Sequence, residues 1–378
     1  MQPLTLSKLK LLQQQQLQEN NDDSLSTQAI LKLQYDSENP YSYSLACLLG
    51  ALIGDALGAT ILYITDPSDE QVENALTMPG GGPLNLLPGQ STDAGELMLG
   101  QTIALVDGNG ELCLDEIAKQ YGFWVNSSPC EIGITTRNAF RPLLVAKVRN
   151  WDAMNPRGLA RLCMSSAKGA NQYSESNGGL MRIAPLAIWG SLLSDSDFYK
   201  AVGAELSLTH PNETSLEAAF TYCMAIRHLL SNLGDMKGAY EKVKAYITKK
   251  KGSRLISWLE GIEEEELPVA NKNIGWARIA WSYSMYFLKI ELKDFTQAMK
   301  RILKLGGDTS KNASIVGAII GAAIGMEEMP EDWVQKLKEV DVSRLELKNR
   351  RDIRYNPETV WELMPKLYKI RPTKLRMV

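Results

Sequence analysis

The stretch Leu305 to Gly321 reads LGGDTSKNASIVGAIIG, and it decides the fold. Two glycines end one amphipathic helix, a short polar turn carries Asp308, and a helix of small apolar residues follows. A helix that is apolar all round is typically central and closely packed by its neighbours. The sequence therefore predicts that the turn from Asp308 to Asn312 points into the body of the protein.

Helical patterns dominate from Tyr41 to about Met326, and β-branched alternating runs are almost absent. The helix before the opening stretch is predicted to be capped by Asp294. Another is predicted to start at Thr214, where Thr214 and Glu217 would form a capping box. These patterns predict an all-α fold, a compact multi-helix bundle.

Composition excludes several classes of protein. The chain has 378 residues, 44% hydrophobic and 22% charged, with a net charge of -3, so it can bury a large core and is not disordered as a whole. This charge balance indicates neither nucleic acid nor an anionic membrane as partner. Five cysteines without C-x-x-C spacing and only two histidines favour free thiols in a reducing compartment and make a zinc site improbable.

The two longest apolar stretches, residues 45–59 and 313–326, fall short of the ~20 residues that span a bilayer. We therefore expect a non-membrane, cytoplasmic protein. Its setting could be a cytoskeletal or other large intracellular assembly.

Three regions are expected along the chain: a Gln-rich N-terminal tail (1–42), a folded domain (43–330) and a basic C-terminal extension (331–378). The ordinary interpretation of the extension is a solvated tail, and the alternative is a docking segment for an acidic protein surface. We expect both ends to contact other protein chains rather than to complete the core.

Four segments combine glycine turns with polar residues in ways that core packing does not require. They are GALIGDALGATILY (50–63), PGQSTDAGELM (88–98), SNGGLMRIAP (176–185) and the opening stretch. Asp93 and Asp308 each have an ordinary explanation as helix caps. Two buried loops that each place threonine beside aspartate favour oxygen ligands for a hard cation instead. Spacing alone leaves both explanations open.

Short motifs in these segments match one known pattern in order along the chain. They are G-D-A-L-G-A at 54–59, T-D at 92–93, N-G with M-R and A-P between 177 and 185, T-H at 209–210, and G-G-D with N-A between 306 and 313. On these motifs the chain resembles the ADP-ribosylglycohydrolase family, in particular the dinitrogenase reductase-activating type, over residues 43–326. The resemblance implies the helical bundle of that family.

The resemblance also implies a cleft with two magnesium ions that assist cleavage of the anomeric bond of ADP-ribose. Three of the implied metal ligands persist here as vestigial positions, Thr92, Asp93 and Asp308. The other implied positions hold residues that are poor metal ligands, namely Leu62, Ala94, Ser310 and Lys311. With these replacements no catalytic residue can be assigned.

Lys311 brings a positive charge to a place where the resemblance implies a metal cation. Its ammonium group could pair with Asp93 and Asp308 and balance the cleft without metal. The alternative is that Lys311 turns outward to solvent. We therefore expect no metal cofactor, and a single weakly bound Mg²⁺ is the alternative.

The resemblance places five further residues near ADP-ribose: Asn177, Gly178, Met181, Arg182 and His210. His210 could equally be a hydrogen-bonded core residue, and Arg182 a structural ion-pair partner. The function that follows is a catalytically inactive structural or ADP-ribose-binding subunit of an assembly. The alternative is an active ADP-ribosyl hydrolase with an atypical or single-metal site.

Overall fold

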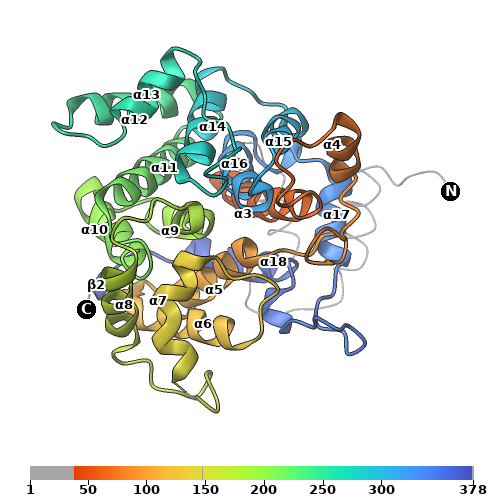
Figure 1. Cartoon of the computed structure of the whole chain (residues 1–378). Coiled ribbons are helices and arrows are strands. Elements are labelled where there is room, and N and C mark those ends of the chain that lie inside the picture. Colours follow the sequence, from red (N-terminus) through yellow and green to blue (C-terminus); the bar gives the residue numbers. More distant parts are fainter. Residues whose placement is uncertain (1–37, 147, 377–378) are drawn as a thin grey trace.

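The computed structural model describes residues 38–146 and 148–376, and the expected N-terminal tail lies almost wholly outside them. Helices make up most of the described chain, which confirms the predicted all-α fold (Figure 1). The α-helices are α3 (Pro40–Ala59), α4 (Asp69–Leu76), α5 (Asp93–Asp107), α6 (Leu114–Asn126), α7 (Ile134–Val145), α8 (Leu159–Ala170), α9 (Ala184–Trp189), α10 (Asp195–Leu206), α11 (Glu213–Ser231), α12 (Met236–Lys249), α13 (Ile256–Glu263), α14 (Ala277–Lys289), α15 (Phe295–Lys304), α16 (Thr309–Ile324), α17 (Glu331–Glu339) and α18 (Thr359–Lys369). The 3-10 helices are η2 (Asn177–Arg182), η3 (Met326–Glu328) and η4 (Ile353–Tyr355), and the strands are β1 (Glu111–Cys113) and β2 (Lys374–Arg376).

The centre of the fold is the antiparallel pair of α3 and α16. Their backbones touch: a Cβ atom on Gly50 would lie 2.2 Å from the carbonyl oxygen of Gly317, and one on Gly317 would lie 2.1 Å from that of Gly50. Only glycine allows so close an approach. All residues of α16 are buried, so the predicted central helix is confirmed.

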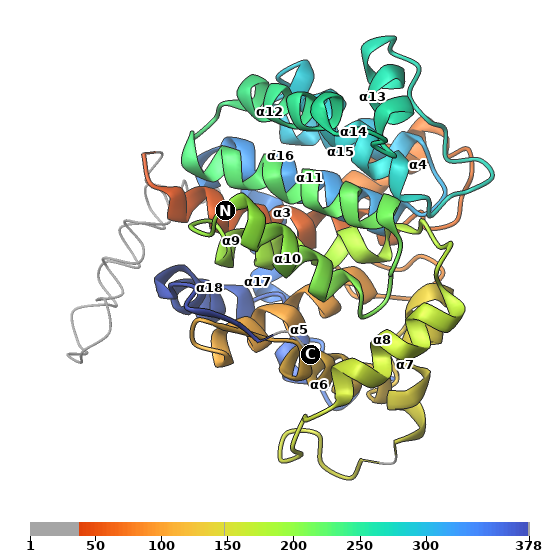
Figure 2. The ribbon, with the colours of Figure 1, turned by 90° about the vertical axis from the view of Figure 1, so that its left-hand side faces the viewer.

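The other helices surround this pair on two sides. Helices α12 to α14 lie on one side and α5 to α8 on the other, as two views at right angles show (Figure 2). Helices α14 and α15 pack directly against α16, and α5 to α8 pack against one another. This arrangement leaves the N-terminal end of α16 close to the start of α5, which positions the site described below.

The two predicted helix starts had different outcomes. Asp294 caps α15 by accepting a hydrogen bond from the Gln297 amide, as expected. The capping box at Thr214 is wrong, because Asn212 caps α11 and Glu217 is buried in an ion pair with Lys250. A polar residue two positions earlier provided an equally good cap.

The C-terminal segment completes the core, so the expectation of an extension outside it is wrong for residues 331–376. Trp333 and Leu337 of α17 and Met364 of α18 are buried, and α18 packs against α5 and α3 (Figure 1). Strand β2 pairs in parallel with β1. In this segment the apolar residues recur at helical spacing between charged residues and form one buried face. This face is not evident from the sequence because basic residues dominate the composition of the segment.

Arg351, one of those basic residues, is among the most deeply buried side chains. It is 2% exposed, and its guanidinium donates to both carboxylate oxygens of Glu96 at 2.7 Å. It also donates to the hydroxyl of Ser127 at 3.0 Å. A buried bidentate pair of this kind ties the C-terminal segment to α5 and to the end of α6.

Within the described residues all five cysteines are free, and Cys47, Cys163 and Cys223 are buried. Helix α3 is long and apolar enough to cross a membrane, but the whole of that apolar window is buried inside the protein. Its composition is accounted for by its place in the core.

Candidate functional site

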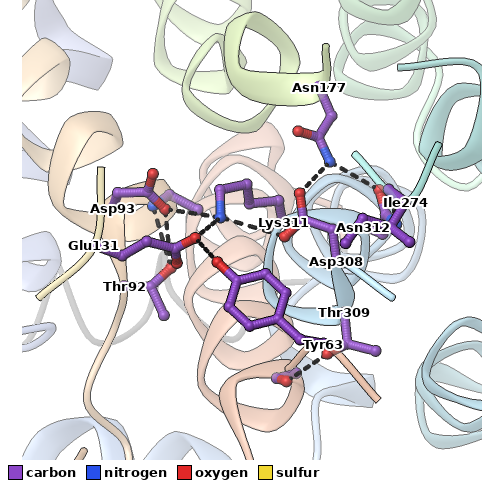
Figure 3. A network of polar contacts seen from close by, with 12 residues as sticks. Tyr63, Thr92, Asp93, Glu131, Asn177, Ile274, Asp308, Thr309, Lys311 and Asn312 are labelled. Carbon is purple, nitrogen blue, oxygen red and sulfur yellow. Dashed lines mark hydrogen bonds and ion pairs between the residues drawn. The ribbon is translucent and has the colours of Figure 1, made fainter. Parts of the chain in front are cut away.

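A cavity of about 750 Å³ opens where the starts of α5, α7 and α16 meet η2 and the loop 273–276. A volume of this order accommodates a ligand the size of a nucleotide. Its lining includes Asp93, Asn177, Asp308 and Lys311, four residues that the sequence had singled out. Figure 3 shows their side chains turned toward one another.

A tight turn delivers Asp308 and Lys311 to this cavity. Gly306 and Gly307 both adopt positive φ angles, 69° and 72°, which favour glycine. The Gly307 carbonyl accepts a hydrogen bond from the amide of Tyr63 at 2.8 Å. Asp308 makes no side-chain cap on α16, so capping does not explain this aspartate.

The ammonium group of Lys311 lies among three carboxylates. Its Nζ is 3.3 Å from Asp93 Oδ1, 3.2 Å from Asp308 Oδ1 and 2.8 Å from Glu131 Oε1. The Lys311 side chain is only 5% exposed. The predicted inward ion pair is thus confirmed, and the outward orientation is wrong (Figure 3).

Burial and charge act against each other at this cluster. Burial lowers the pKa of Lys311, but Asp308, Asp93 and Glu131 together raise that pKa well above its usual value. Burial raises the pKa of both Asp93 and Asp308, and the nearby ammonium group opposes the rise. Lys311 is therefore charged at neutral pH, and the cluster holds more acidic groups than basic ones.

Two buried carboxylate oxygens in this cluster, Asp93 Oδ2 and Glu131 Oε2, have no hydrogen-bond partner among the described residues. Asp93 is 1% exposed and lines the cavity. A buried carboxylate oxygen without a donor is costly. The Asp93 carboxyl is thus poised to take up a proton or to accept a hydrogen bond from a ligand.

Asp55 on α3 organises the start of α5. Its carboxylate accepts hydrogen bonds from the amide and hydroxyl of Thr92, at 2.8 and 2.6 Å, and from the amide of Gly95 at 2.9 Å. Burial raises the pKa of Asp55 to about 7, against the effect of these bonds. The Thr92 hydroxyl is consequently engaged away from the cavity, and Thr92 does not line it.

The remaining replaced positions lie behind the cavity wall. Leu62, Ala94 and Ser310 are 2%, 0% and 0% exposed, and none of them lines the cavity. Leu62 and Ala94 are packed in the interior as apolar side chains. The Ser310 hydroxyl is buried and has no partner among the described residues.

The residues expected near a ligand separate into two groups. Asn177, Gly178 and Met181 line the cavity, and the Asn177 amide donates to Asp308 Oδ2 at 3.0 Å. Arg182 and His210 are buried and do not line it. The prediction that these two residues contact a ligand is therefore not supported by their placement.

The side chains of Arg182 and His210 instead lie in the core and contact η2 on the side away from the cavity. Arg182 pairs with Glu205 at 2.8 Å and donates to the carbonyl of Gly178 at 3.0 Å. A Cβ on Gly178 would lie 3.3 Å from the His210 ring. These contacts are the structural roles that the sequence had left open as alternatives.

Sequence reasoning missed two cavity residues, Glu131 and Tyr63. The Tyr63 hydroxyl donates to Glu131, and Tyr63 adopts a left-handed φ of 70°, which is uncommon outside glycine. Tyr63 directly follows Leu62, and Glu131 directly precedes Ile132 and Gly133 of the cavity wall. Neither had a spacing signal, because only the tertiary fold brings them to Lys311.

The donors present do not fit the two magnesium ions that the resemblance implied. Ions bound to the carboxylates at about 2.1 Å would lie close to the Lys311 ammonium, which already contacts Asp93 and Asp308. Like charges at such distances repel strongly. Across residues 38–146 and 148–376, no group of three or more His, Cys, Asp or Glu side chains could hold a metal ion.

Comparisons with known proteins agree on one family. The family model described as ADP-ribosylglycohydrolase matches residues 36–366. The chain is 27% identical over 300 residues to the ADP-ribosyl-[dinitrogen reductase] glycohydrolase of Rhodospirillum rubrum, which covers 78% of this chain and 90% of that protein. It is 24% identical over 297 residues to the ADP-ribosylarginine hydrolase Tri1 of Pseudomonas putida, a match that covers 77% of this chain and 72% of that protein. It is 25% identical over 341 residues to the ADP-ribosylhydrolase ARH3 of Mus musculus, a match that covers 78% of this chain and 88% of that protein.

A solved structure supports the fold. The chain in a structure titled ADP-ribosylglycohydrolase-related protein complex superposes with a TM-score of 0.64 at 20% identity, covering 88% of this chain and 99% of that one. The family model, which spans residues 36–366, begins before α3 and ends inside α18. The C-terminal helices are therefore part of the matched region.

Proposed function

The chain belongs to the ADP-ribosylglycohydrolase family, and we propose that it binds an ADP-ribosyl group without hydrolysing it by a metal-dependent route. The proposal rests on one observation. The Lys311 ammonium lies within 3.3 Å of carboxylates from α5, α16 and the loop before α7. An internal cation thus occupies the place that divalent ions would need.

Loss of hydrolysis follows from what a lysine cannot supply. A divalent ion can polarise a sugar oxygen and activate a water molecule. An ammonium group carries one charge and three donors, and at Lys311 they are directed at Asp93, Asp308 and Glu131. Removing groups that orient reacting atoms commonly costs orders of magnitude in rate.

Retained binding is supported by the shape and the lining of the cavity. Asn177, Gly178 and Met181 line it together with the hydroxyl residues Thr135 and Ser176. The unpartnered oxygens of Asp93 and Glu131 can accept hydrogen bonds from ribose hydroxyls. A ligand that meets these acceptors would relieve part of their desolvation cost.

The test compares hydrolysis with binding. The protein should release negligible ADP-ribose from a peptide ADP-ribosylated on arginine, in the presence of Mg²⁺, while calorimetry detects binding of free ADP-ribose. The variant Asn177→Leu should weaken that binding, since it fills the cavity wall and removes a polar group. Leu345 is 82% exposed and does not line the cavity, so Leu345→Ala is the control. Efficient release of ADP-ribose by the unmodified protein would disprove the proposal.

A second candidate is a hydrolase that uses carboxyl groups alone, and one observation favours it. Burial raises the pKa of Asp93, as required of a general acid at neutral pH. Glu131 and Asp308 lie on the same cavity and could act as the paired carboxylate. Metal-independent release of ADP-ribose that Asp93→Asn abolishes would establish this function instead.

Partners and location remain proposals of the same kind. We propose that residues outside the described chain, 1–37, contact other proteins, because their Gln-rich composition favours a segment outside the core. A cytoplasmic location is proposed from the free cysteines. Co-purification of partner proteins with the full chain and with a variant lacking residues 1–37 would test the proposed contacts. If the shortened protein retains every partner, the proposal is disproved.

A further inference from the structure

A chain of hydrogen bonds leads from the buried core to the cavity wall. Arg182 Nη2 lies 2.8 Å from Thr209 Oγ1, Thr209 Oγ1 lies 2.7 Å from His210 Nδ1, and His210 Nε2 lies 2.8 Å from Ser176 Oγ. Arg182 and Thr209 are fully buried and His210 is 1% exposed, whereas Ser176 lines the cavity. The chain therefore joins residues that no ligand can reach to one that a ligand can touch.

The direction of this chain is fixed at its buried end. A guanidinium group has only donors and keeps its charge in proteins, so Arg182 must donate to Thr209 Oγ1. The Thr209 hydroxyl has one proton, and among the described residues its bonding partner besides Arg182 is His210 Nδ1. Thr209 satisfies this proton only by donating it to Nδ1. His210 Nδ1 is therefore the acceptor and carries no proton.

The other ring nitrogen must then carry the proton of a neutral imidazole. Burial and the charge of Arg182 lower the pKa of His210 to about 3, so the ring is neutral and has one N–H. That N–H is on Nε2 and donates to Ser176 Oγ. The Ser176 hydroxyl proton is thereby turned away from His210, toward Thr135 Oγ1 at 3.1 Å or toward the cavity. Ser174 Oγ lies 2.8 Å from Thr135 Oγ1 and 3.4 Å from Ser176 Oγ, so Ser174 can donate to Thr135 and leave the Thr135 and Ser176 protons for a ligand.

We infer that Arg182, acting through Thr209 and His210, holds Ser176 as a hydrogen-bond donor on the cavity wall, so that this wall binds an acceptor oxygen of the ligand. Phosphoryl and carboxylate oxygens have this chemistry. Thr135 lines the cavity beside Ser176 and extends the wall. With the opposite tautomer, Ser176 would donate to the ring and would offer the ligand no proton.

This arrangement divides the cavity into two chemical surfaces. The hydroxyl wall of Thr135 and Ser176 donates, whereas the cluster of Asp93, Glu131 and Asp308 accepts. Arg182 and His210 touch no ligand, so they are positioning residues. The ligand part of the inference rests on the proposed function, whereas the tautomer of His210 does not.

Nitrogen NMR tests the tautomer directly. The chain has two histidines, and the second, His228, bonds to Asp235 at the surface, so its ring signals serve as the internal reference. His210 should stay neutral from pH 5 to 8 and show its proton on Nε2. A proton on Nδ1, or titration of His210 in this range, would overturn the inference.

Substitution of Thr209 tests the donor to the ring. Thr209→Val keeps the shape of the side chain but removes the hydroxyl. The nitrogen chemical shift of His210 Nδ1 should then move to the value of an unprotonated ring nitrogen that accepts no hydrogen bond. Thr209→Ser keeps the hydroxyl and should restore the original signal. An Nδ1 signal that is the same in all three proteins would contradict the proposed direction.

Substitution of His210 tests the consequence for binding, with ADP-ribose as the probe in calorimetry. His210→Phe removes the donor to Ser176 and should weaken binding by about tenfold, the value of one hydrogen bond. His210→Gln places an amide donor near the Nε2 position and should restore most of it. Adding Ser176→Ala to His210→Phe should cause a smaller loss than Ser176→Ala causes in the wild-type protein, because His210 acts on the ligand through the Ser176 hydroxyl.

Additive losses in that double variant would show that His210 acts only on the fold and would overturn the inference. If wild-type protein binds no ADP-ribose at all, the proposed function fails. The NMR measurement then still decides whether Arg182 sets the direction of the chain. The two failures are therefore distinguishable.

Discussion

Removal of the Lys311 ammonium should destabilise the fold in a pH-dependent way. The Lys311→Met side chain has similar length but no charge, and it leaves Asp93, Asp308 and Glu131 without the cation they share. The lysine side chain is 5% exposed, and its three ion-pair distances are 2.8 to 3.3 Å. Breaking a buried pair by removing one partner costs about 3–5 kcal/mol. We expect a loss of that size in the free energy of unfolding at pH 7.5.

The loss should shrink as the pH falls. Without the ammonium, the pKa values of Asp93 and Asp308, which burial already raises, should rise further. The folded variant then holds more protons than the folded wild type. For each extra proton the loss decreases by about 1.4 kcal/mol per pH unit. Urea unfolding of both proteins between pH 5.5 and 7.5 measures this difference.

Lys300 offers a matched control. It pairs with Glu73 on the surface, and its side chain is 45% exposed, so Lys300→Met should cost far less stability than Lys311→Met. The reasoning is refuted if Lys311→Met costs no more than Lys300→Met. A large loss that does not change with pH would also refute it, because the carboxylates would then not be responsible.

Three other predictions concern the core and the site. Arg351→Met leaves Glu96 buried without its cation and should cost about 3–5 kcal/mol in urea unfolding; a loss below about 1 kcal/mol would mean that the C-terminal segment is not part of the core. Gly317→Ala would place a Cβ 2.1 Å from a backbone oxygen of α3 and should cost about 1–3 kcal/mol or more. As a control, a Cβ on Gly169 would meet no atom within 4 Å, so Gly169→Ala should be neutral or stabilise α8 by up to about 1 kcal/mol. Equal melting temperatures of the two variants would contradict the close pairing of α3 and α16. Burial raises the pKa of Asp93, so the folded protein holds a proton that the unfolded chain loses above pH ~4. The free energy of unfolding should therefore fall as the pH rises from there toward the raised pKa. Asp93→Asn should flatten this dependence of stability on pH, and an unchanged dependence would exclude Asp93 as its source.

The parts of the fold that sequence predicts well are those with local signals. The apolar residues of α16 indicated a central helix, since they occupy every face of the helix beyond its first turn. The two glycines before Asp308 indicated a turn into the interior. Lys311 could be predicted to pair with Asp308 because residues three apart share one face of a helix.

The parts that sequence predicts poorly depend on distant contacts. Glu131 reaches Lys311 across 180 residues, and no pattern near either residue indicates it. Arg351 appeared as one of several basic residues in a charged tail, yet it is bound to Glu96, 255 residues away. Arg182 and His210 lie within recognisable motifs, but the motifs do not say whether a side chain faces the ligand or the core.

The central claim is that the Lys311 ammonium stands in place of a metal centre, and Mg²⁺ calorimetry tests it most directly. The unmodified protein should show no tight Mg²⁺ binding. The fourfold variant Leu62→Glu, Ala94→Asp, Ser310→Asp and Lys311→Thr adds three carboxylates, removes the competing cation and should recover binding. Tight Mg²⁺ binding by the unmodified protein, lost in Asp308→Ala, would contradict the claim.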